Sequence, residues 1–126
     1  MKKILLDSWA WLEIFYGSQT GQQIKEIVKK AETVYTTTAN LYEVMYREEQ
    51  NQGRSHAENK REFIEHKSVI QDITRPVIQE ALNMRRMHKL AAIDAFTLAS
   101  ANLLEATLVS GDPDFRSIKG VLYLGP

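Results

Sequence analysis

Lys3-Ile4-Leu5-Leu6-Asp7-Ser8 is the stretch of this sequence that decides the fold. Its short, continuous apolar run is typical of a strand that is buried on both faces in a parallel sheet. Asp7 comes where this strand ends, and the pair Asp7-Ser8 can cap a helix that is expected from about Trp9 to Tyr16. The stretch therefore predicts a buried strand, an acid at its carboxyl end and a helix directly after it.

Short strands and helices continue to alternate along the rest of the chain. Further strands are expected where β-branched and aromatic residues gather, at residues 34–37, around 69–70, at 107–109 and at 121–124. Further helices are expected where apolar residues recur at helical spacing, at residues 20–31, 39–52, 55–66, 74–89 and 91–105, with a loop at 111–114. This order predicts an α/β fold with a central parallel sheet, in which ligands gather outside the carboxyl ends of the strands.

The composition indicates a small globular protein without a strong charge preference. The 126 residues fit one domain, and 44% hydrophobic with 25% charged residues are typical of a soluble chain. The formal net charge is zero, so binding to nucleic acid would need a local basic patch. The absence of cysteine excludes disulfides, thiolate zinc sites and a cysteine nucleophile. No apolar stretch suits a signal peptide or a membrane span, so a cytoplasmic location is expected.

Four acidic residues lie beside apolar segments in different parts of the chain. Asp7 and Asp112 come where expected strands end, whereas Glu43 and Asp94 lie in expected helices. A charge that is taken out of water must be paired, protonated or bound to a metal. Two carboxylates about 5 Å apart repel each other by roughly 3 kcal/mol at an effective dielectric constant near 20. Several acids that meet at one place therefore indicate a site for a hard cation such as Mg²⁺ or Mn²⁺.

Each of these acids also has an ordinary structural explanation. Asp7 can be the N-cap of a helix, and Glu43 can pair with Arg47 one turn further along a helix surface. Asp94 near a helix N-terminus is favoured by the helix dipole, and Asp112-Pro113-Asp114 can be a polar turn. These explanations apply to single acids, and they do not account for four acids in this order.

The order of the acids resembles that of PIN-domain nucleases, most closely the small VapC-type toxins. Four blocks carry the resemblance: Leu5-Leu6-Asp7-Ser8, Asn40-Leu41-Tyr42-Glu43-Val44, Asp94-Ala95 in an alanine-rich helix, and Leu108-Val109-Ser110-Gly111-Asp112-Pro113-Asp114-Phe115. In the last block, Ser110 replaces the commoner threonine but keeps the hydroxyl. The resemblance covers the whole chain and implies that residues 1–126 form a single PIN domain, a three-layer α/β/α sandwich with a central parallel sheet.

The resemblance also implies a metal-dependent endoribonuclease that hydrolyses RNA phosphodiester bonds with Mg²⁺ or Mn²⁺. Asp7, Asp94 and Asp112 would bind the metal, directly or through water. Glu43, the fourth catalytic acid, would orient the attacking water or hold the metal ligands in place from outside. A bound metal lowers the pKa of a water ligand and stabilises charge on the phosphate. Accessory roles are implied for three further polar residues, Asp114, Ser8 and Ser110, of which the two serines can also satisfy local backbone groups.

Several partners and alternatives follow from the same resemblance. A VapC-type toxin implies an RNA substrate, a homodimer and a cognate VapB-like antitoxin that covers the acidic cleft, with no membrane partner. The alternatives are a PIN-domain nuclease of RNA processing or decay and a non-catalytic PIN-like module that binds RNA or a partner. A phosphoacceptor receiver-like domain would need an acidic pair after the first strand, and a phosphatase would need an Asp-x-Asp motif there. The stretch Asp7-Ser8-Trp9 fits neither.

Basic and aromatic residues give weaker signals. Two basic clusters, at residues 54–61 and 85–89, can hold RNA phosphates, although a charge cluster is usually a solvated face. Trp9 and Trp11 are expected to be core or interface anchors rather than platforms for base stacking. The three histidines show no shared spacing for a metal.

Overall fold

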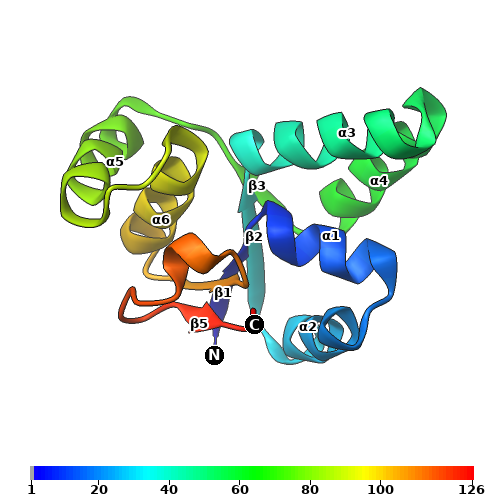
Figure 1. The fold of residues 1–126 in the computed structure, drawn as a ribbon, viewed down its shortest axis with the longest axis horizontal. Coiled ribbons are helices and arrows are strands. Elements are labelled where there is room, and N and C mark those ends of the chain that lie inside the picture. The colour runs from blue at the N-terminus through cyan, green and yellow to red at the C-terminus, as the bar shows by residue number, and fades with distance from the viewer. Residues whose placement is uncertain (1) are drawn as a thin grey trace.

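The structure of the chain, a computed structural model, describes residues 2–126 and has a central sheet of five parallel strands (Figure 1). The strands are β1 (Lys3–Leu6), β2 (Thr33–Thr37), β3 (Val69–Gln71), β4 (Thr107–Ser110) and β5 (Leu122–Tyr123). The helices are α1 (Ser8–Tyr16), α2 (Gln19–Lys30), α3 (Thr38–Gln52), α4 (Arg54–Lys67), α5 (Arg75–His88) and α6 (Ala92–Leu104). Helices α1 to α4 lie on one side of the sheet, and α5 and α6 lie on the other, which gives three layers (Figure 1).

Strand β1 lies in the middle of the sheet, whose strand order is β3-β2-β1-β4-β5. It pairs with β2 on one side and with β4 on the other, where Leu6 lies opposite Val109. The chain moves outward from β1 to β3 and then crosses over to β4, so the strand order reverses direction between β1 and β4. Ligands of open α/β sheets bind at such a switch point. The acids that follow these two strands, Asp7 and Asp112, therefore meet at the edge of the sheet where a ligand is expected.

Strand β1 is buried on both faces, as its continuous apolar run predicts. Leu5 packs with residues of α5 and α6, including Leu98, on one face of the sheet. Ile4 and Leu6 pack on the other face with residues of α1 to α4, including Val44. Because neighbouring side chains of a strand point to opposite faces, both cores fix β1. The residue that follows it is therefore held in a defined position.

Side-chain caps begin two helices at this same edge of the sheet. Asp7 Oδ1 accepts a hydrogen bond of 2.9 Å from the Ala10 N–H at the start of α1. Thr37 Oγ1 accepts one of 3.0 Å from the Asn40 N–H at the start of α3. Gly17 ends α1 with a φ of 69°, a left-handed conformation that glycine adopts without strain. The caps thus turn the chain from strand to helix where the acids gather.

The predicted α/β order is confirmed, and most elements differ by one or two residues from their expected bounds. The expected loop after β4 contains a 3₁₀ turn, Pro113–Phe115, because the Asp112 side chain accepts the Asp114 N–H at 2.9 Å and proline fixes φ. The last strand, expected at 121–124, is limited to Leu122–Tyr123, the two residues in register with β4. These two corrections affect the C-terminal quarter of the chain.

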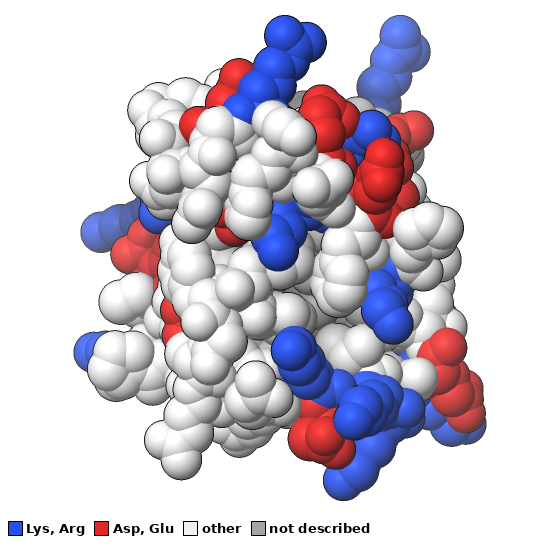
Figure 2. Space-filling model, turned by 90° about the vertical axis from the view of Figure 1, so that its right-hand side faces the viewer, with Lys and Arg blue, Asp and Glu red and all other residues white. Residues whose placement is uncertain are grey.

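Charges of both signs are interspersed on the side of the molecule that α1 to α4 form (Figure 2). This distribution agrees with the net charge of zero, and it gives no large field of one sign on the face in view. Within residues 2–126, no helix combines the length and the apolar character that crossing a membrane requires.

Candidate active site

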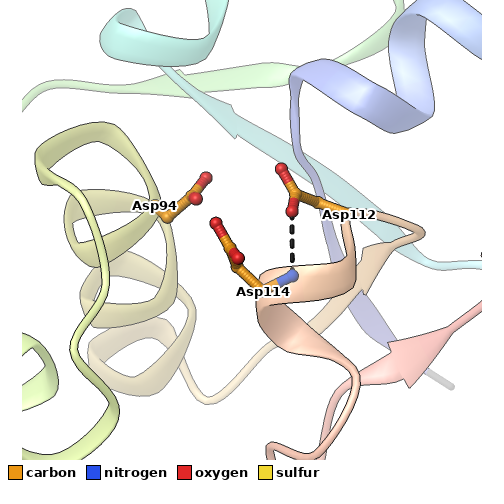
Figure 3. A group of neighbouring side chains, drawn as sticks. All are labelled: Asp94, Asp112 and Asp114. Atoms are coloured by element: carbon orange, nitrogen blue, oxygen red, sulfur yellow. Dashed lines mark hydrogen bonds between the residues drawn. The ribbon is translucent and has the colours of Figure 1, made fainter.

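Three carboxylates converge at the carboxyl edge of the sheet (Figure 3). Asp94 lies in the first turn of α6, and Asp112 and Asp114 lie in the loop after β4. One carboxylate oxygen from each residue lies within 4.8 Å of the other two. We call these residues the outer acids. Hard divalent cations prefer close oxygen donors and fill their remaining positions with water, so the outer acids fit a divalent cation.

Ser110 fixes the loop that carries two of the outer acids. Its hydroxyl accepts a hydrogen bond of 3.0 Å from the Asp112 N–H and donates one of 2.5 Å to Asp7 Oδ2. The Asp114 N–H then donates to Asp112 Oδ1. Because Ser110 contacts both β1 and the loop, it links Asp7 to the outer acids through one hydroxyl.

Asp7 is nearly inaccessible, with 4% of its surface exposed. Its two oxygens accept hydrogen bonds, Oδ1 from the Ala10 N–H and Oδ2 from Ser110. Burial raises the pKa of Asp7 to about 7, against the opposing effect of these hydrogen bonds and with a further increase from the charges of Asp94 and Asp112. Asp7 is thus coupled to the outer acids by charge, although it does not belong to their close group.

Asp94 has an equally perturbed carboxyl group. Partial burial raises its pKa to about 7, and the negative charges of three neighbours contribute, those of Asp112, Asp114 and Glu43. A cation at this position would favour the ionised form of every one of these groups. The clustered acids therefore disfavour one another's charge in the metal-free protein and suit a site that binds a cation.

A cavity of about 340 Å³ opens beside the acids. Its lining residues come from α1, α3, α6 and the loops at the sheet edge: Ser8, Trp9, Leu12, Glu43, Arg47, Ala91, Ala92, Ile93, Asp94 and Asp112. Glu43 lines this cavity together with Asp94 and Asp112. Within residues 2–126, no ion pair joins Glu43 to Arg47, so the surface-pair explanation for Glu43 finds no support.

A buried polar network joins the helices that carry the site. Asn40, with 1% of its surface exposed, donates from its side-chain amide to Ser8 Oγ and to Thr97 Oγ1, each at 3.1 Å. The Thr97 hydroxyl in turn donates to the Ile93 carbonyl oxygen at 2.7 Å. These bonds tie α1, α3 and α6 together. Because buried polar groups need partners, the network holds the three helices in one arrangement and positions the acids on them.

Sequence reasoning missed this network and Arg47 as a site residue. A signal existed for the network, because Asn40 precedes Glu43 by three residues and Thr97 follows Asp94 by three. Residues at that spacing share a helix face, so polar side chains beside the acids could have been assigned to the same site. For Arg47, one turn after Glu43, the sequence pattern indicated only a surface pair with Glu43.

The two basic clusters lie outside the cavity. Among the described residues that line the cavity, Arg47 is the one basic residue. In the first cluster, Arg61 pairs with Glu58 and Glu65 of its own helix. In the second, Arg85 donates to the Leu90 carbonyl oxygen at the end of α5. These local partners account for the two arginines without a nucleic acid.

Comparison with known proteins agrees with this architecture. The sequence model of the PIN domain matches residues 4–121, and the chain belongs to the PIN domain family. No curated protein matches the chain.

Among solved structures, the chain is similar to a chain of a toxin–antitoxin complex from Klebsiella pneumoniae, with 22% identity, coverage of 94% of each chain and a TM-score of 0.78. It is also similar to VapC20 from Mycobacterium tuberculosis, with 17% identity, coverage of 98% of this chain and 99% of that one, and a TM-score of 0.78. A chain of VapBC2 from Rickettsia felis, solved with a promoter DNA fragment, shows 14% identity, 98% coverage of each chain and a TM-score of 0.76. At these identities the matches establish the shared fold.

Proposed function

We propose that the chain is a metal-dependent endoribonuclease, the toxin of a VapBC-type toxin–antitoxin pair, with residues 1–126 as one PIN domain. The observation that carries this proposal is the close group of outer acids at the switch point of the sheet, backed by Asp7. Membership of the PIN domain family supports it. So do the structural neighbours, of which VapC20 is described as a toxin that cleaves the sarcin–ricin loop.

In this proposal the aspartates at the cavity bind the metal. Asp94 and Asp112, with Asp114 beside them, bind Mg²⁺ or Mn²⁺. Asp7 binds the cation directly or through a water. Its two oxygens also accept hydrogen bonds, from the Ala10 N–H and the Ser110 hydroxyl, which hold the carboxylate in place. When bound, the cation stabilises charge on the scissile phosphate and makes a water ligand more acidic.

Two residues of α3 line the same cavity and contact the attacking water and the phosphate. Glu43 accepts a hydrogen bond from the attacking water and directs its oxygen toward phosphorus. Arg47 pairs with a non-bridging phosphate oxygen, because a guanidinium provides several donors for one phosphate group. The Asn40 network keeps α3 at a fixed position relative to Asp94.

Cleavage assays on tRNA and rRNA with purified protein test the nuclease activity. Mg²⁺ or Mn²⁺ is expected to support cleavage and a chelator to abolish it, with restoration when metal is added back. Asp94→Asn is expected to be inactive. Asp72→Asn is the matched control, because Asp72 also follows a strand, β3, yet is exposed and lies outside the cavity. Metal-independent cleavage, or full activity of Asp94→Asn, would contradict the proposal.

The toxin role has a separate test in cells. Several similar structures are toxin–antitoxin complexes, and a toxin of this class would act as a cytoplasmic homodimer with an antitoxin that covers the acidic cavity. Expression of the wild-type chain is expected to arrest growth, and expression of Asp94→Asn is not. Co-expression of a small protein from the adjacent reading frame should restore growth and co-purify with the chain. Nuclease activity without growth arrest would favour a role in RNA processing or decay.

A further inference from the structure

Trp9 forms part of the wall of the acidic cavity and also packs against the core on the side of the sheet that α1 to α4 cover. It is the second residue of α1, it is half-buried, and it lines the cavity together with Asp94 and Asp112. Its six-membered ring lies against Gly111, where an added Cβ would overlap the ring. Gly111 directly precedes Asp112 in the loop of the outer acids. The indole is therefore held beside the acids by a glycine that leaves room for it.

The two tryptophans of α1 have different environments. Trp11 is 1% exposed, and its indole N–H donates to Thr36 Oγ1 at 3.0 Å. The Trp9 indole N–H has no hydrogen-bond partner within residues 2–126, and it is not among the buried atoms that lack one, so it reaches the surface. Trp11 is the core anchor that the sequence predicted. Trp9 lines the cavity, is half-buried, and has an indole N–H that reaches the surface.

The cavity is larger and more apolar than a metal site requires. A cation with six water-sized ligands needs about 180 Å³, at about 30 Å³ for each water. The cavity of about 340 Å³ leaves room for a further group of similar size. Apolar residues line it as well as the acids, namely Leu12, Ile93 and the two alanines Ala91 and Ala92, together with Trp9. A flat, uncharged group that is linked to a phosphate suits a cavity whose lining combines acidic, apolar and aromatic side chains.

We propose that Trp9 stacks on a nucleobase next to the scissile phosphate and is a binding residue of this site. The inference rests on the proposed nuclease function and adds the part of the substrate that the cavity recognises. Every nucleobase has an aromatic face, so stacking on Trp9 tolerates different bases. A base that is paired within a helix is already stacked on its neighbours, and it would have to leave the duplex to reach the cavity. The contribution of Trp9 is therefore measured on a single-stranded RNA, whose bases are free to stack on it.

Kinetics on a single-stranded RNA provide the first test. Trp9→Leu is expected to raise KM on the order of tenfold while kcat changes much less, because stacking contributes to binding. Trp9→Phe keeps a smaller aromatic face and should show a smaller rise. Tyr16→Leu is the matched control, because Tyr16 is an exposed aromatic residue at the far end of α1, outside the cavity, and should leave KM unchanged. An unchanged KM in both Trp9 variants would overturn the inference.

Tryptophan fluorescence provides a test that needs no turnover. An eight-nucleotide single-stranded RNA, added with Ca²⁺ in place of Mg²⁺ or Mn²⁺, is expected to quench the emission of the wild-type protein. In Trp9→Phe the remaining emission comes from the buried Trp11 and should not respond, and a blunt RNA duplex should not quench either protein. Quenching that persists in Trp9→Phe, or its absence in the wild type, would overturn the inference. A wild-type protein that cleaves no RNA but shows the Trp9-dependent quench would refute the nuclease proposal alone.

Discussion

Asp7 and Asp94 reach the same raised pKa, about 7, in different surroundings. For Asp7 the main cause is complete burial, which two hydrogen bonds oppose. For Asp94 the main cause is also burial, but it is partial, and the charges of three neighbouring acids add to it. The pKa of Asp7 is therefore determined mainly by the protein interior. The pKa of Asp94 depends more on the charges around the cavity, including those of any bound ion.

Because of this difference, we expect Asp7 and Asp94 to respond differently to metal binding and to salt. A cation among the outer acids would reverse the repulsion around Asp94 directly. The effect of the cation on Asp7 would pass through Ser110, whose hydroxyl donates a hydrogen bond to Asp7 and accepts one from the Asp112 N–H in the loop. Variants that lack one acid or the Ser110 hydroxyl should therefore affect Asp7 and Asp94 differently. So should the removal of metal or a change in salt concentration.

The largest expected effect is the loss of cleavage when either acid becomes an amide. Asp94→Asn should lower kcat/KM by about a thousandfold or more, because it removes a charge from the proposed cation site. Asp7→Asn should cost on the order of a hundredfold, since it removes a second charge that the cation needs, whether Asp7 binds it directly or through a water. Both variants should keep the fold, because they relieve repulsion in the metal-free protein. Cleavage rates and melting curves measure the two effects, and undiminished cleavage by both variants would exclude these acids from catalysis.

The next effect in size concerns the link between the two regions. Ser110→Ala should lower kcat/KM by about ten- to a hundredfold, because it removes a hydrogen bond to Asp7 and one from the Asp112 N–H. Ser110→Thr keeps the hydroxyl and should retain most activity. Ser100→Ala is the matched control, because Ser100 is also a buried serine, but its hydroxyl has no hydrogen-bond partner within residues 2–126. Equal activity of both alanine variants would show that the link is dispensable.

Metal binding should produce a smaller, thermodynamic effect. A cation that binds the folded state stabilises it by about 2.7 kcal/mol at a hundredfold excess over its Kd. Mn²⁺ or Mg²⁺ should therefore raise the Tm of the wild-type protein clearly, that of Asp7→Asn less, and that of Asp94→Asn least. Thermal melts with increasing metal and a chelator control measure this order. Identical shifts in all three proteins would point to binding elsewhere.

The smallest expected effect is the dependence of stability on pH and salt without metal. Both carboxyl groups have folded-state pKa values near 7, above their ordinary value of 3.8. As pH rises from about 4 to about 7, the unfolded chain releases these protons first, so the free energy of unfolding should fall over that range. Each Asn variant should flatten the fall. Added salt should reduce the contribution of Asp94, which repulsion partly sets, and leave that of Asp7 nearly unchanged. Denaturation curves at several pH values and two salt concentrations test this.

The sequence predicted most of the fold because its strands and caps are determined locally. The apolar run before Asp7 requires burial on both faces, and Thr74 and Pro76 mark the start of α5. Asp7 and Asp112 could be assigned to one edge because parallel strands end on the same side, whereas Glu43 and Asp94 lie in helices and were added by the resemblance. Their PIN-like order added the expected division of roles among them.

The finer geometry of the site depends on contacts that no local pattern contains. Asp7 and Ser110 meet because Leu6 lies opposite Val109 in the sheet. Asp114 joins the outer acids because a 3₁₀ turn brings it back toward Asp94. The resemblance gave Asp114 an accessory role, and its place among the outer acids depends on this 3₁₀ turn, which the sequence pattern did not predict.

The close packing of Trp9 on Gly111 also limits how this protein can vary. The two residues come from opposite ends of the chain but fill one shared volume. A side chain at position 111 would displace the indole, whereas a small residue at position 9 would leave a gap that a larger neighbour could fill. A library randomised at both positions and selected for folding should therefore return a large residue with a small one, in either arrangement. Only the native arrangement would also keep an aromatic wall at the cavity.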